Sequence, residues 1–442
     1  MKGQRPLSFP EDTTKTQQND YHLTQWNGYR MPSFTMNHTA LIYLLMTAFL
    51  FHACNTGSSL AAPPLQSDAP KTPAEQPNFD AIESIVRQGI QDGQMPGAVV
   101  VIADQDSILY RRAFGQRQVE PTAEPMTLDT VFDLASLTKP VATATSVMQL
   151  IGDGLVSPHQ KVADHLPEFG KYGKDKITIA DLLLHVGGLI PDNSLHDYRD
   201  GLDASWQNIC NLKPIASRGE NFAYTDVGFI VLGKLVEHVT KQSLDQYAKQ
   251  SVFTPLGMTE TTFNPSTALK KRAAATEQRN GQWIKGEVHD PRAHLLQGVA
   301  GHAGLFSTAD DLTRYGQQML RIAKGKKSTP LSQATFKMMT RPRDVRRDSQ
   351  TIGTRTYGWD HRSPYSSNRG DQLSDSAFGH GGFTGTVMWI DPDSDRVFLF
   401  LSNRLHPDGK GSINRLAGKI ASIVGASANG SSNTDAKTKA NP

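Results

Sequence analysis

The sequence is poor in cysteine and carries little net charge. Its 442 residues include two cysteines, Cys54 and Cys210, which are too few to build a disulfide framework. The 46 basic and 43 acidic residues leave a formal net charge of +3, and no Lys/Arg-rich run with interleaved aromatic residues occurs. This pattern argues against a nucleic-acid-binding protein. No repeat of fixed period is present, and a chain that is 38% hydrophobic can bury a sizeable core.

Several common active-site motifs are missing as well. The sequence contains no H-E-x-x-H, which argues against that class of zinc enzyme. No G-x-x-x-x-G-K-[ST] follows a strand pattern, so a phosphate-binding loop is not indicated. The absence of G-x-S-x-G argues against an α/β-hydrolase.

The most apolar segment is too short to span a bilayer. LIYLLMTAFLF, residues 41–51, instead fits the apolar region of a secretory signal, and no charged residue occurs between Arg30 and Asp68. Cleavage before Cys54 would resemble bacterial lipoprotein processing and would allow a lipid anchor at that cysteine. Cleavage after Ala61 would fit an ordinary signal peptidase. Either route predicts export to the periplasm or to the membrane surface of a bacterial cell envelope.

Composition divides the chain into three parts. Residues 1–77 are predicted to hold the signal or lipoprotein-like segment and a flexible linker rich in Pro, Ala and Ser. Residues 78–425 are predicted to be one folded domain, and residues 426–442 a disordered tail. Met31 and Met36 remain alternatives for the true start.

The order of the predicted elements indicates an α+β fold. The segment 97–115 predicts two strands around a turn at 104–106, and the segment 385–404 predicts two more strands around an Asp/Pro turn. The middle is mainly helical: LLLHVGG, GFIVLGKLVEHV and TADDLTRYGQQMLRIAKG all have helical spacing. Strands from both termini should therefore form one antiparallel sheet, flanked by helices and lying beside an all-helical lobe.

A serine and a lysine stand three residues apart in FDLASLTKPVATATSVMQL. Pro140 is tolerated in a helix only in its first turn, so we predict that a helix begins near Ala135 or Ser136. Residues three apart share a helix face, which can bring the Lys139 amine beside Ser136 Oγ. A lysine destabilised as a cation by burial could then act as a base for the serine. On its own, the pair could equally be a helix-capping serine and a solvated lysine.

Two later motifs favour the catalytic interpretation. Tyr224-Thr225-Asp226 directly precedes an apolar helix, and His380-Gly381-Gly382 leads into a predicted strand. In this order, the three motifs resemble those of the serine β-lactamase and penicillin-binding protein superfamily: S-x-x-K, Y-x-N and K-T-G. The resemblance covers about residues 78–425 and is strongest to the group of class C β-lactamases, D-Ala-D-Ala carboxypeptidases and related esterases. It implies the β-lactamase/transpeptidase-like fold.

The resemblance also implies roles for individual residues. Ser136 would form an acyl-enzyme, while Lys139 and Tyr224 would share the proton transfers. The backbone N–H groups of Ser136 and Phe383 would form the oxyanion hole, and no cofactor or metal would be required. His302, in a glycine-rich loop that matches the cleft lining of the family, would contact the substrate.

This sequence departs from the family pattern at three substrate-binding positions. His380 and Gly381 replace the lysine and threonine of K-T-G, and Asp226 replaces the asparagine of Y-x-N. The first two changes remove groups that hold a carboxylate, and the third adds negative charge. We therefore expect poor β-lactam hydrolysis and a preference for a neutral ester, or for an amide whose charge lies elsewhere.

Other polar residues have simpler interpretations. His289, Asp290, His294 and His302 include zinc-ligand types, but a loop at the cleft rim explains them as well. His185 is predicted to be a hydrogen-bonded structural histidine, and Cys210 a small buried hydrophobe.

The sequence thus predicts an exported serine acyl hydrolase that acts on an ester or a D-amino-acid peptide in the cell envelope. One alternative is a protein that binds penicillin or cell-wall peptides with little turnover, and another is a true β-lactamase. The ligand would be a small ester, a β-lactam or a peptidoglycan-derived peptide. Oligomeric state and physiological substrate are left open.

Overall fold

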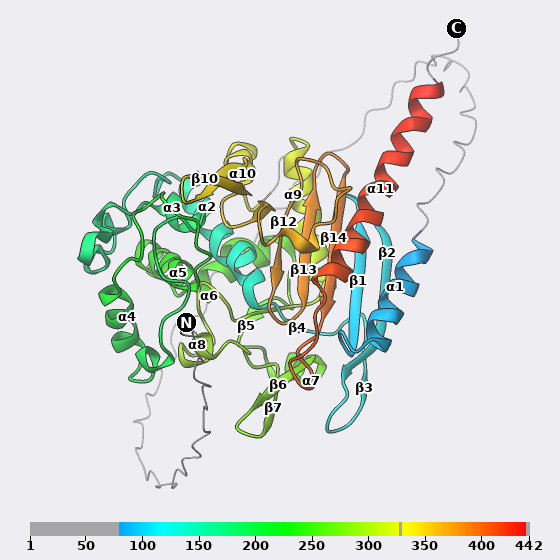
Figure 1. Ribbon diagram of the computed structural model, residues 1–442, viewed down its shortest axis with the longest axis horizontal. Helices are drawn as coiled ribbons and strands as arrows, with labels where there is room; N and C mark the ends of the chain where they lie inside the picture. Colours follow the sequence, from blue (N-terminus) through cyan, green and yellow to red (C-terminus); the bar gives the residue numbers. More distant parts are fainter. Residues whose placement is uncertain (1–78, 327–328, 439–442) are drawn as a thin grey trace, which may run out of the picture. The chain divides into compact units, whose positions relative to one another are not determined.

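Strands from both ends of the described chain meet in the middle of one antiparallel sheet, as the sequence predicts (Figure 1). The computed structural model describes residues 79–326 and 329–438. In this part the sheet has nine strands in the order β3-β2-β1-β14-β13-β12-β11-β10-β9. Their bounds are β1 Gly97–Ala103, β2 Ile108–Gln118, β3 Glu124–Pro125, β9 Arg343–Arg347, β10 Gln350–Arg355, β11 Asp360–Arg362, β12 Phe378–Gly382, β13 Thr386–Asp391 and β14 Arg396–Ser402.

Both predicted hairpins are present, and a side chain shapes the first turn. The Asp104 carboxylate accepts hydrogen bonds from the backbone N–H groups of Asp106 and Ser107, at 2.9 and 2.6 Å. Such turns are a frequent use of aspartate between strands. Strand β1 then pairs with β14, in a register that places Ala98 opposite Ser402.

The central strands are buried on both faces. Val99 and Val101 of β1 belong to one hydrophobic cluster, whereas Val100 and Ile102 belong to another. Helices α1 (Asp80–Gln91) and α11 (Asn414–Thr438) cover the second face, and α9 (Ala309–Ala323) covers the first (Figure 1). Thr308 caps α9, because its side chain accepts a hydrogen bond from the Asp311 N–H. Helix α11 continues to Thr438, beyond residue 425, where the sequence prediction ends the fold.

The middle of the chain forms the predicted helical lobe, which is built around α5. Its apolar face packs against α2 and α3, and a small sheet of order β4-β8-β5 links the lobe to the central sheet. The helices are α2 Thr145–Gly152, α3 Ile179–Leu183, α4 Leu202–Asn211, α5 Asp226–Thr240, α6 Leu244–Ala248, α7 Thr267–Arg272, α8 Pro291–Leu295 and α10 Gln333–Thr340. The short strands are β4 Phe132–Asp133, β5 Thr262–Phe263, β6 Ala275–Arg279, β7 Gln282–Lys285 and β8 Leu305–Ser307.

One predicted helix ends earlier than expected. LLLHVGG was expected to be helical, but α3 ends at Leu183. His185 then adopts φ +59°, and Gly188 φ +73°. This turn redirects the chain and brings His185 toward α5, where it contributes to the site described below.

The predicted leader, including Cys54, lies outside the described residues. Within the described ranges, none of the helices combines the length and the apolar character needed to cross a bilayer.

Core packing at the centre of the sheet predicts a large stability effect. Leu399 of β14 is fully buried, whereas 57% of Leu155 is exposed. We expect Leu399→Ala to lower the free energy of unfolding by about 2–5 kcal/mol, because it leaves a cavity. The control Leu155→Ala should change it by less than about 0.5 kcal/mol. Equilibrium urea unfolding measures both, and equal effects would contradict this description of the core.

Candidate active site

Ser136 lies on a strained turn between strand β4 and helix α2. The preceding residue, Ala135, has φ +45°, an unusual conformation for a residue with a Cβ. Its N–H is held by the Asp133 carboxylate at 2.8 Å. A 3-10 turn at Ala135–Leu137 follows, and then a wide turn over Lys139–Ala144 that begins with Lys139 and Pro140. The predicted start of a helical segment near Ser136 is confirmed, although its first turns are not regular α-helix.

The Lys139 amine lies among three acceptor oxygens, two of which accept hydrogen bonds from it and one of which forms an ion pair with it. Its Nζ lies 3.1 Å from Ser136 Oγ and 3.1 Å from the His302 backbone oxygen. It also lies 2.6 Å from Asp226 Oδ1, at the N-terminus of α5. The lysine side chain has no exposed area. Three acceptors around one buried nitrogen are what a charged amine needs there.

The charge state of Lys139 differs from the sequence expectation. We expected burial to destabilise the cation, and burial does act to lower the pKa of Lys139. The carboxylate of Asp226 outweighs it, and the pKa is raised above its ordinary value. Asp226 was predicted to meet the substrate, but in the structure it is the counter-ion of Lys139. A charged Lys139 can donate to Ser136 Oγ but cannot accept a proton from it.

Tyr224 stands beside this pair, and after Asp226 its oxygen also contributes to the raised pKa of Lys139. Lys139 Nζ is 4.9 Å from the centre of its ring, and the hydroxyl is buried without a hydrogen-bond partner among the described residues. His185 stacks on the ring at 4.4 Å and accepts the Thr225 N–H at 3.0 Å through Nδ1. Burial, followed by the charges of Arg355 and Lys139, lowers the pKa of His185 well below its usual value. A neutral His185 thus supports Tyr224, in agreement with its predicted structural role.

The turn after β12 packs directly on the Ser136 turn. The hydroxyls of Thr384 and Thr386 donate to the backbone oxygens of Asp133 and Leu134, at 2.7 and 3.1 Å. A Cβ at Gly382 would lie 2.3 Å from the Leu134 oxygen, so only glycine permits this approach. These contacts hold the segment that carries Phe383 against the turn that carries Ser136. The two backbone N–H groups predicted for the oxyanion hole belong to these two segments.

His380 offers a lone pair to the cleft and carries no charge. Its Nδ1 is 2.7 Å from the Gly381 oxygen, which can only accept, so Nδ1 carries the hydrogen. Burial, then Arg355 and Lys139, lowers the pKa of His380 well below its usual value. Nε2 of the neutral ring is therefore an acceptor, whereas the lysine of the family motif is a cationic donor.

Ser136 lies where two cavities meet. One has a volume of about 380 Å³ and the other about 770 Å³, and Ser136, Tyr224, Tyr365 and Phe383 line both. The smaller cavity is lined further by His380, Gly381 and Gly382, and the larger by Asp226, Asp290 and His302. The Phe383 side chain is 61% exposed at this junction. A substrate could thus extend to both sides of the serine.

The histidines considered as zinc ligands do not converge. His289 bonds to Glu277 at 2.5 Å, and His294 pairs with Glu287 at 2.9 Å. Ligand atoms of Asp226, Asp290 and His302 do lie within 4.8 Å of one another. However, Asp226 is already the partner of the Lys139 ammonium, and His302 is bonded to Asp290 at 3.0 Å. This donor set fits a positively charged lysine better than a second cation, and His302 contacts Lys139 through its backbone.

Sequence reasoning missed two arginines near the site, in segments without a motif. Arg355 of β10 is fully buried and pairs with Asp360 of β11 at 3.3 Å. Its Cζ lies 5.8 Å from the centre of the Tyr224 ring. Arg404, just after β14, has its Cζ 4.5 Å from the centre of the Phe383 ring. The strand that carries Arg355 reads QTIGTR, and this mixed, mostly polar composition gives no sequence signal for a buried arginine.

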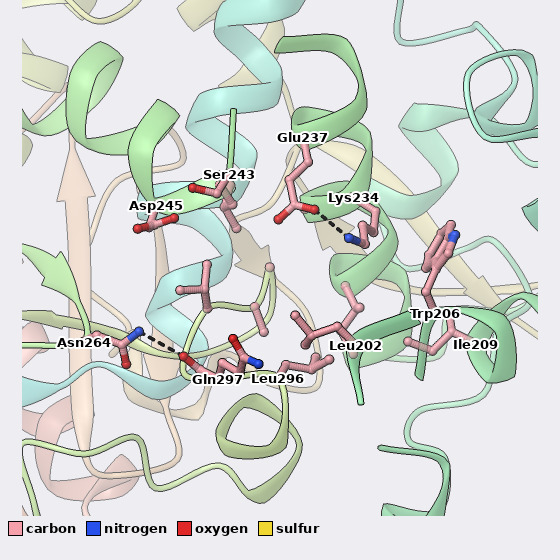
Figure 2. Close-up of a pocket in the computed structure, with 16 residues that line it drawn as sticks. Leu202, Trp206, Ile209, Lys234, Glu237, Ser243, Asp245, Asn264, Leu296 and Gln297 are labelled. Atoms are coloured by element: carbon pink, nitrogen blue, oxygen red, sulfur yellow. Dashed lines mark hydrogen bonds and ion pairs between the residues drawn. The ribbon is translucent and has the colours of Figure 1, made fainter. Parts of the chain in front are cut away.

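A third cavity of about 270 Å³ lies against α5 and does not include Ser136 (Figure 2). Trp206, Ile209 and Leu296 supply much of its apolar lining, and the Lys234–Glu237 ion pair of 2.8 Å lies at its edge. Gly301 belongs to its wall and directly precedes His302. This cavity therefore borders the segment that holds Lys139, without being part of the site.

The family model and the similar proteins agree on the family of this chain. Residues 82–422 match the family model described as Beta-lactamase. An N-acetylmuramyl-L-alanine amidase of Bacillus subtilis is 32% identical over 362 residues, which cover 74% of this chain and 80% of that protein. A putative D-alanyl-D-alanine carboxypeptidase of Escherichia coli is 29% identical over 400 residues, with 82% and 91% covered.

Solved structures support the fold. The structure of EstCE1, a hydrolase with promiscuous acyltransferase activity, superposes with a TM-score of 0.64 and 22% sequence identity. The match covers 78% of this chain and 97% of that one. The predicted β-lactamase/transpeptidase-like fold is confirmed.

The Lys139–Asp226 ion pair predicts a stability change that depends on pH. Removing the carboxylate by Asp226→Asn leaves a buried charge unpaired, so we expect a loss of about 3–5 kcal/mol near neutral pH. Because the folded pKa of Lys139 is raised, the contribution of the pair is complete below the unfolded lysine pKa of about 10.4. It is lost as the pH rises through the folded value.

The difference in free energy of unfolding between wild type and Asp226→Asn, measured by urea at about pH 7 and about pH 11, should therefore be smaller at about pH 11, which lies above the unfolded lysine pKa but still below the raised folded value. A difference that stays constant between the two conditions would show that Asp226 acts by packing alone.

Proposed function

We propose, given that this chain belongs to the β-lactamase family of serine hydrolases, that Ser136 forms an acyl-enzyme with an ester or a D-amino-acid peptide of the cell envelope. The observation that carries the proposal is the 3.1 Å contact between Ser136 Oγ and Lys139 Nζ at the junction of two cavities. A helix-capping serine with a solvated lysine would not bury the lysine completely or surround it with three acceptors.

In the proposed acylation, Tyr224 is the base and enters the step as a phenolate, whose negative charge the neighbouring Lys139 ammonium stabilises. Oγ of Ser136 attacks the substrate carbonyl carbon, and the serine proton passes to the Tyr224 oxygen as the C–O bond forms. Lys139 stays an ammonium throughout, because Asp226 holds it charged, and its donation to Oγ stabilises the developing negative charge. The tyrosine then gives the proton to the leaving oxygen or nitrogen as that bond breaks.

The same groups can complete the reaction in reverse order. A water molecule takes the place of the leaving group, gives its proton to Tyr224 and attacks the acyl carbon. The Ser136–acyl bond then breaks, and Oγ recovers the proton from Tyr224. Backbone N–H groups of Ser136 and Phe383 would hold the carbonyl oxygen in both steps, with Gly382 allowing the two segments to approach.

The substrate class follows from the departures from the family motifs. A neutral His380 and a glycine at 381 provide neither the ammonium nor the hydroxyl that would hold a β-lactam carboxylate. The names of the relatives support a cell-wall fragment, since one is an N-acetylmuramyl-L-alanine amidase and another a putative D-alanyl-D-alanine carboxypeptidase. Export to the cell envelope, by either predicted cleavage, is part of the proposal.

Ser136→Ala should abolish covalent labelling by a fluorophosphonate probe, because the nucleophile is gone. Tyr224→Phe should retain the fold and lower kcat/KM for p-nitrophenyl butyrate about 10²–10⁴-fold, as expected for loss of a general base. Intact-protein mass spectrometry and initial rates measure the two effects. If wild-type protein is not labelled, a non-catalytic binder becomes the better reading.

A substrate panel separates the branches of the family. We expect wild type to hydrolyse p-nitrophenyl butyrate or an N-acetylmuramyl or D-alanyl peptide with a higher kcat/KM than nitrocefin. The physical reason is that the third motif lacks a cation. Chromogenic and amine-release assays, each repeated with Ser136→Ala as background, measure this order. Nitrocefin as the best substrate by a wide margin would identify a true β-lactamase and overturn the assignment.

A further inference from the structure

The cavity against α5 has the size and the lining of a small-molecule site (Figure 2). Its volume is about 270 Å³, and an apolar cavity of about 150 Å³ is enough to hold benzene in an engineered protein. Apolar side chains from α4, α5, α6 and the segment after α8 make up most of its wall, among them Leu202, Trp206, Ile209, Ile230, Leu244 and Leu296. The ring or chain of a small organic molecule would therefore find apolar contacts there.

Three charged residues line this cavity, and two of them neutralise each other. Lys234 and Glu237 form the ion pair of 2.8 Å. The third is Asp245, which is partly buried and whose carboxylate forms no ion pair or side-chain hydrogen bond in the described ranges of the chain. The lining thus holds one negative charge that lacks a counter-ion among the other lining residues, and a bound cation would compensate it.

Ser243 lies close to Asp245 and keeps its hydroxyl available. It directly precedes α6, at a position where serine usually accepts a hydrogen bond from the helix backbone. The Ser243 side chain accepts no such bond, whereas Ser266 before α7 and Ser332 before α10 both do. Figure 2 shows Ser243 and Asp245 on the same side of the cavity. A hydroxyl and a carboxylate together offer acceptors for the N–H groups of a protonated amine.

Two walls of the cavity are continuous with segments that hold Lys139. Helix α5 contributes Gly233, and the same helix begins at Asp226, the counter-ion of Lys139. Another wall ends at Gly301, directly before His302, whose backbone oxygen accepts from the Lys139 amine at 3.1 Å. The cavity therefore lies behind two of the three acceptors that surround this amine.

Gly301 packs on α5 without room for a side chain. A Cβ at Gly301 would lie 1.9 Å from the Phe229 oxygen. The Gly301 oxygen also accepts from the buried hydroxyl of Thr143 at 2.7 Å, and Thr143 belongs to the wide turn that begins with Lys139. A molecule in the cavity would contact both α5 and Gly301, so its binding free energy would also stabilise this junction.

We propose that this cavity binds a small hydrophobic primary amine. The ring or chain of the amine lies among the apolar side chains, and its ammonium binds Asp245 and Ser243. The bound amine stabilises the segment that precedes His302, and so acts on the surroundings of Lys139 from outside the two cavities that meet at Ser136. This site is independent of acyl-enzyme formation.

Three ligands with the same apolar body test the site. Phenylbutylamine, phenylbutanol and phenylbutanoate differ in charge, and titration calorimetry measures the affinity of each. We expect the amine to bind about fivefold or more tightly than the alcohol, and the carboxylate to bind most weakly, because Asp245 attracts only the ammonium. Asp245→Asn keeps the shape of the side chain and should bring the amine and the alcohol to within about twofold of each other.

Asp192→Asn is the matched control, since Asp192 is a carboxylate of the larger cavity beside Ser136. It should leave the preference for the amine unchanged. A preference that survives Asp245→Asn, or equal binding of amine and alcohol by the wild type, would overturn the proposal. Loss of the preference in Asp192→Asn would place the amine in the catalytic cleft, with the same consequence. If Asp245→Asn does not fold, Leu202→Asn, at a side chain that is 40% exposed, should weaken the binding of all three ligands.

Hydrogen exchange tests the effect on the segment around Gly301. With saturating phenylbutylamine, amide exchange in residues 296–305 should slow about threefold or more, while α1 on the far face of the sheet should exchange as before. Unchanged exchange in residues 296–305, or equal slowing in α1, would contradict the stabilisation. Failure of fluorophosphonate labelling would count against acylation of Ser136 and would leave these measurements unaffected, so the two proposals can fail separately.

Discussion

The buried ion pair between Lys139 and Asp226 organises the whole site. It joins the turn after β4 to the first residue of α5, and through the His302 oxygen it reaches the glycine-rich segment before β8. Burying a charge without a partner is expensive, so these three segments can come together only when the amine and the carboxylate meet. The contact between Lys139 and Asp226 therefore also helps to position Ser136, which accepts a hydrogen bond from the same amine.

The pair also changes how the proton chemistry is divided. With Asp226 present, the lysine is held as a cation, and the mechanism that we propose therefore assigns the proton transfers to the buried oxygen of Tyr224. His185 stacks behind the ring and is kept neutral because burial lowers its pKa well below the usual value, and Arg355 lies beside the ring in an ion pair with Asp360.

The sequence alone predicted those strands and helices whose residue pattern is local. Short apolar runs on either side of turn residues predicted β1, β2, β13 and β14, and helical spacing of apolar residues predicted α5 and α9, because these patterns are encoded locally. The partner of Lys139 could not be found this way, since Asp226 lies 87 positions further along the chain and looks like a motif variant. The position of Arg404 near the site could not be predicted for the same reason, because its contact with Phe383 and its place in the cavity wall are evident only in the structure.

The strand order has a consequence for how this enzyme is made. Strand β1 lies between β2 and β14, so the first strand of the domain acquires its inner neighbour only after residue 402 has been synthesised. The nucleophile turn rests on the β12–β13 turn, which is equally late in the chain. A growing polypeptide therefore holds a complete serine–lysine motif long before it can hold a shaped cleft. A chain truncated before β14 would lack the strand that separates β1 from β13, and with it the support for the β12–β13 turn against which the Ser136 turn packs.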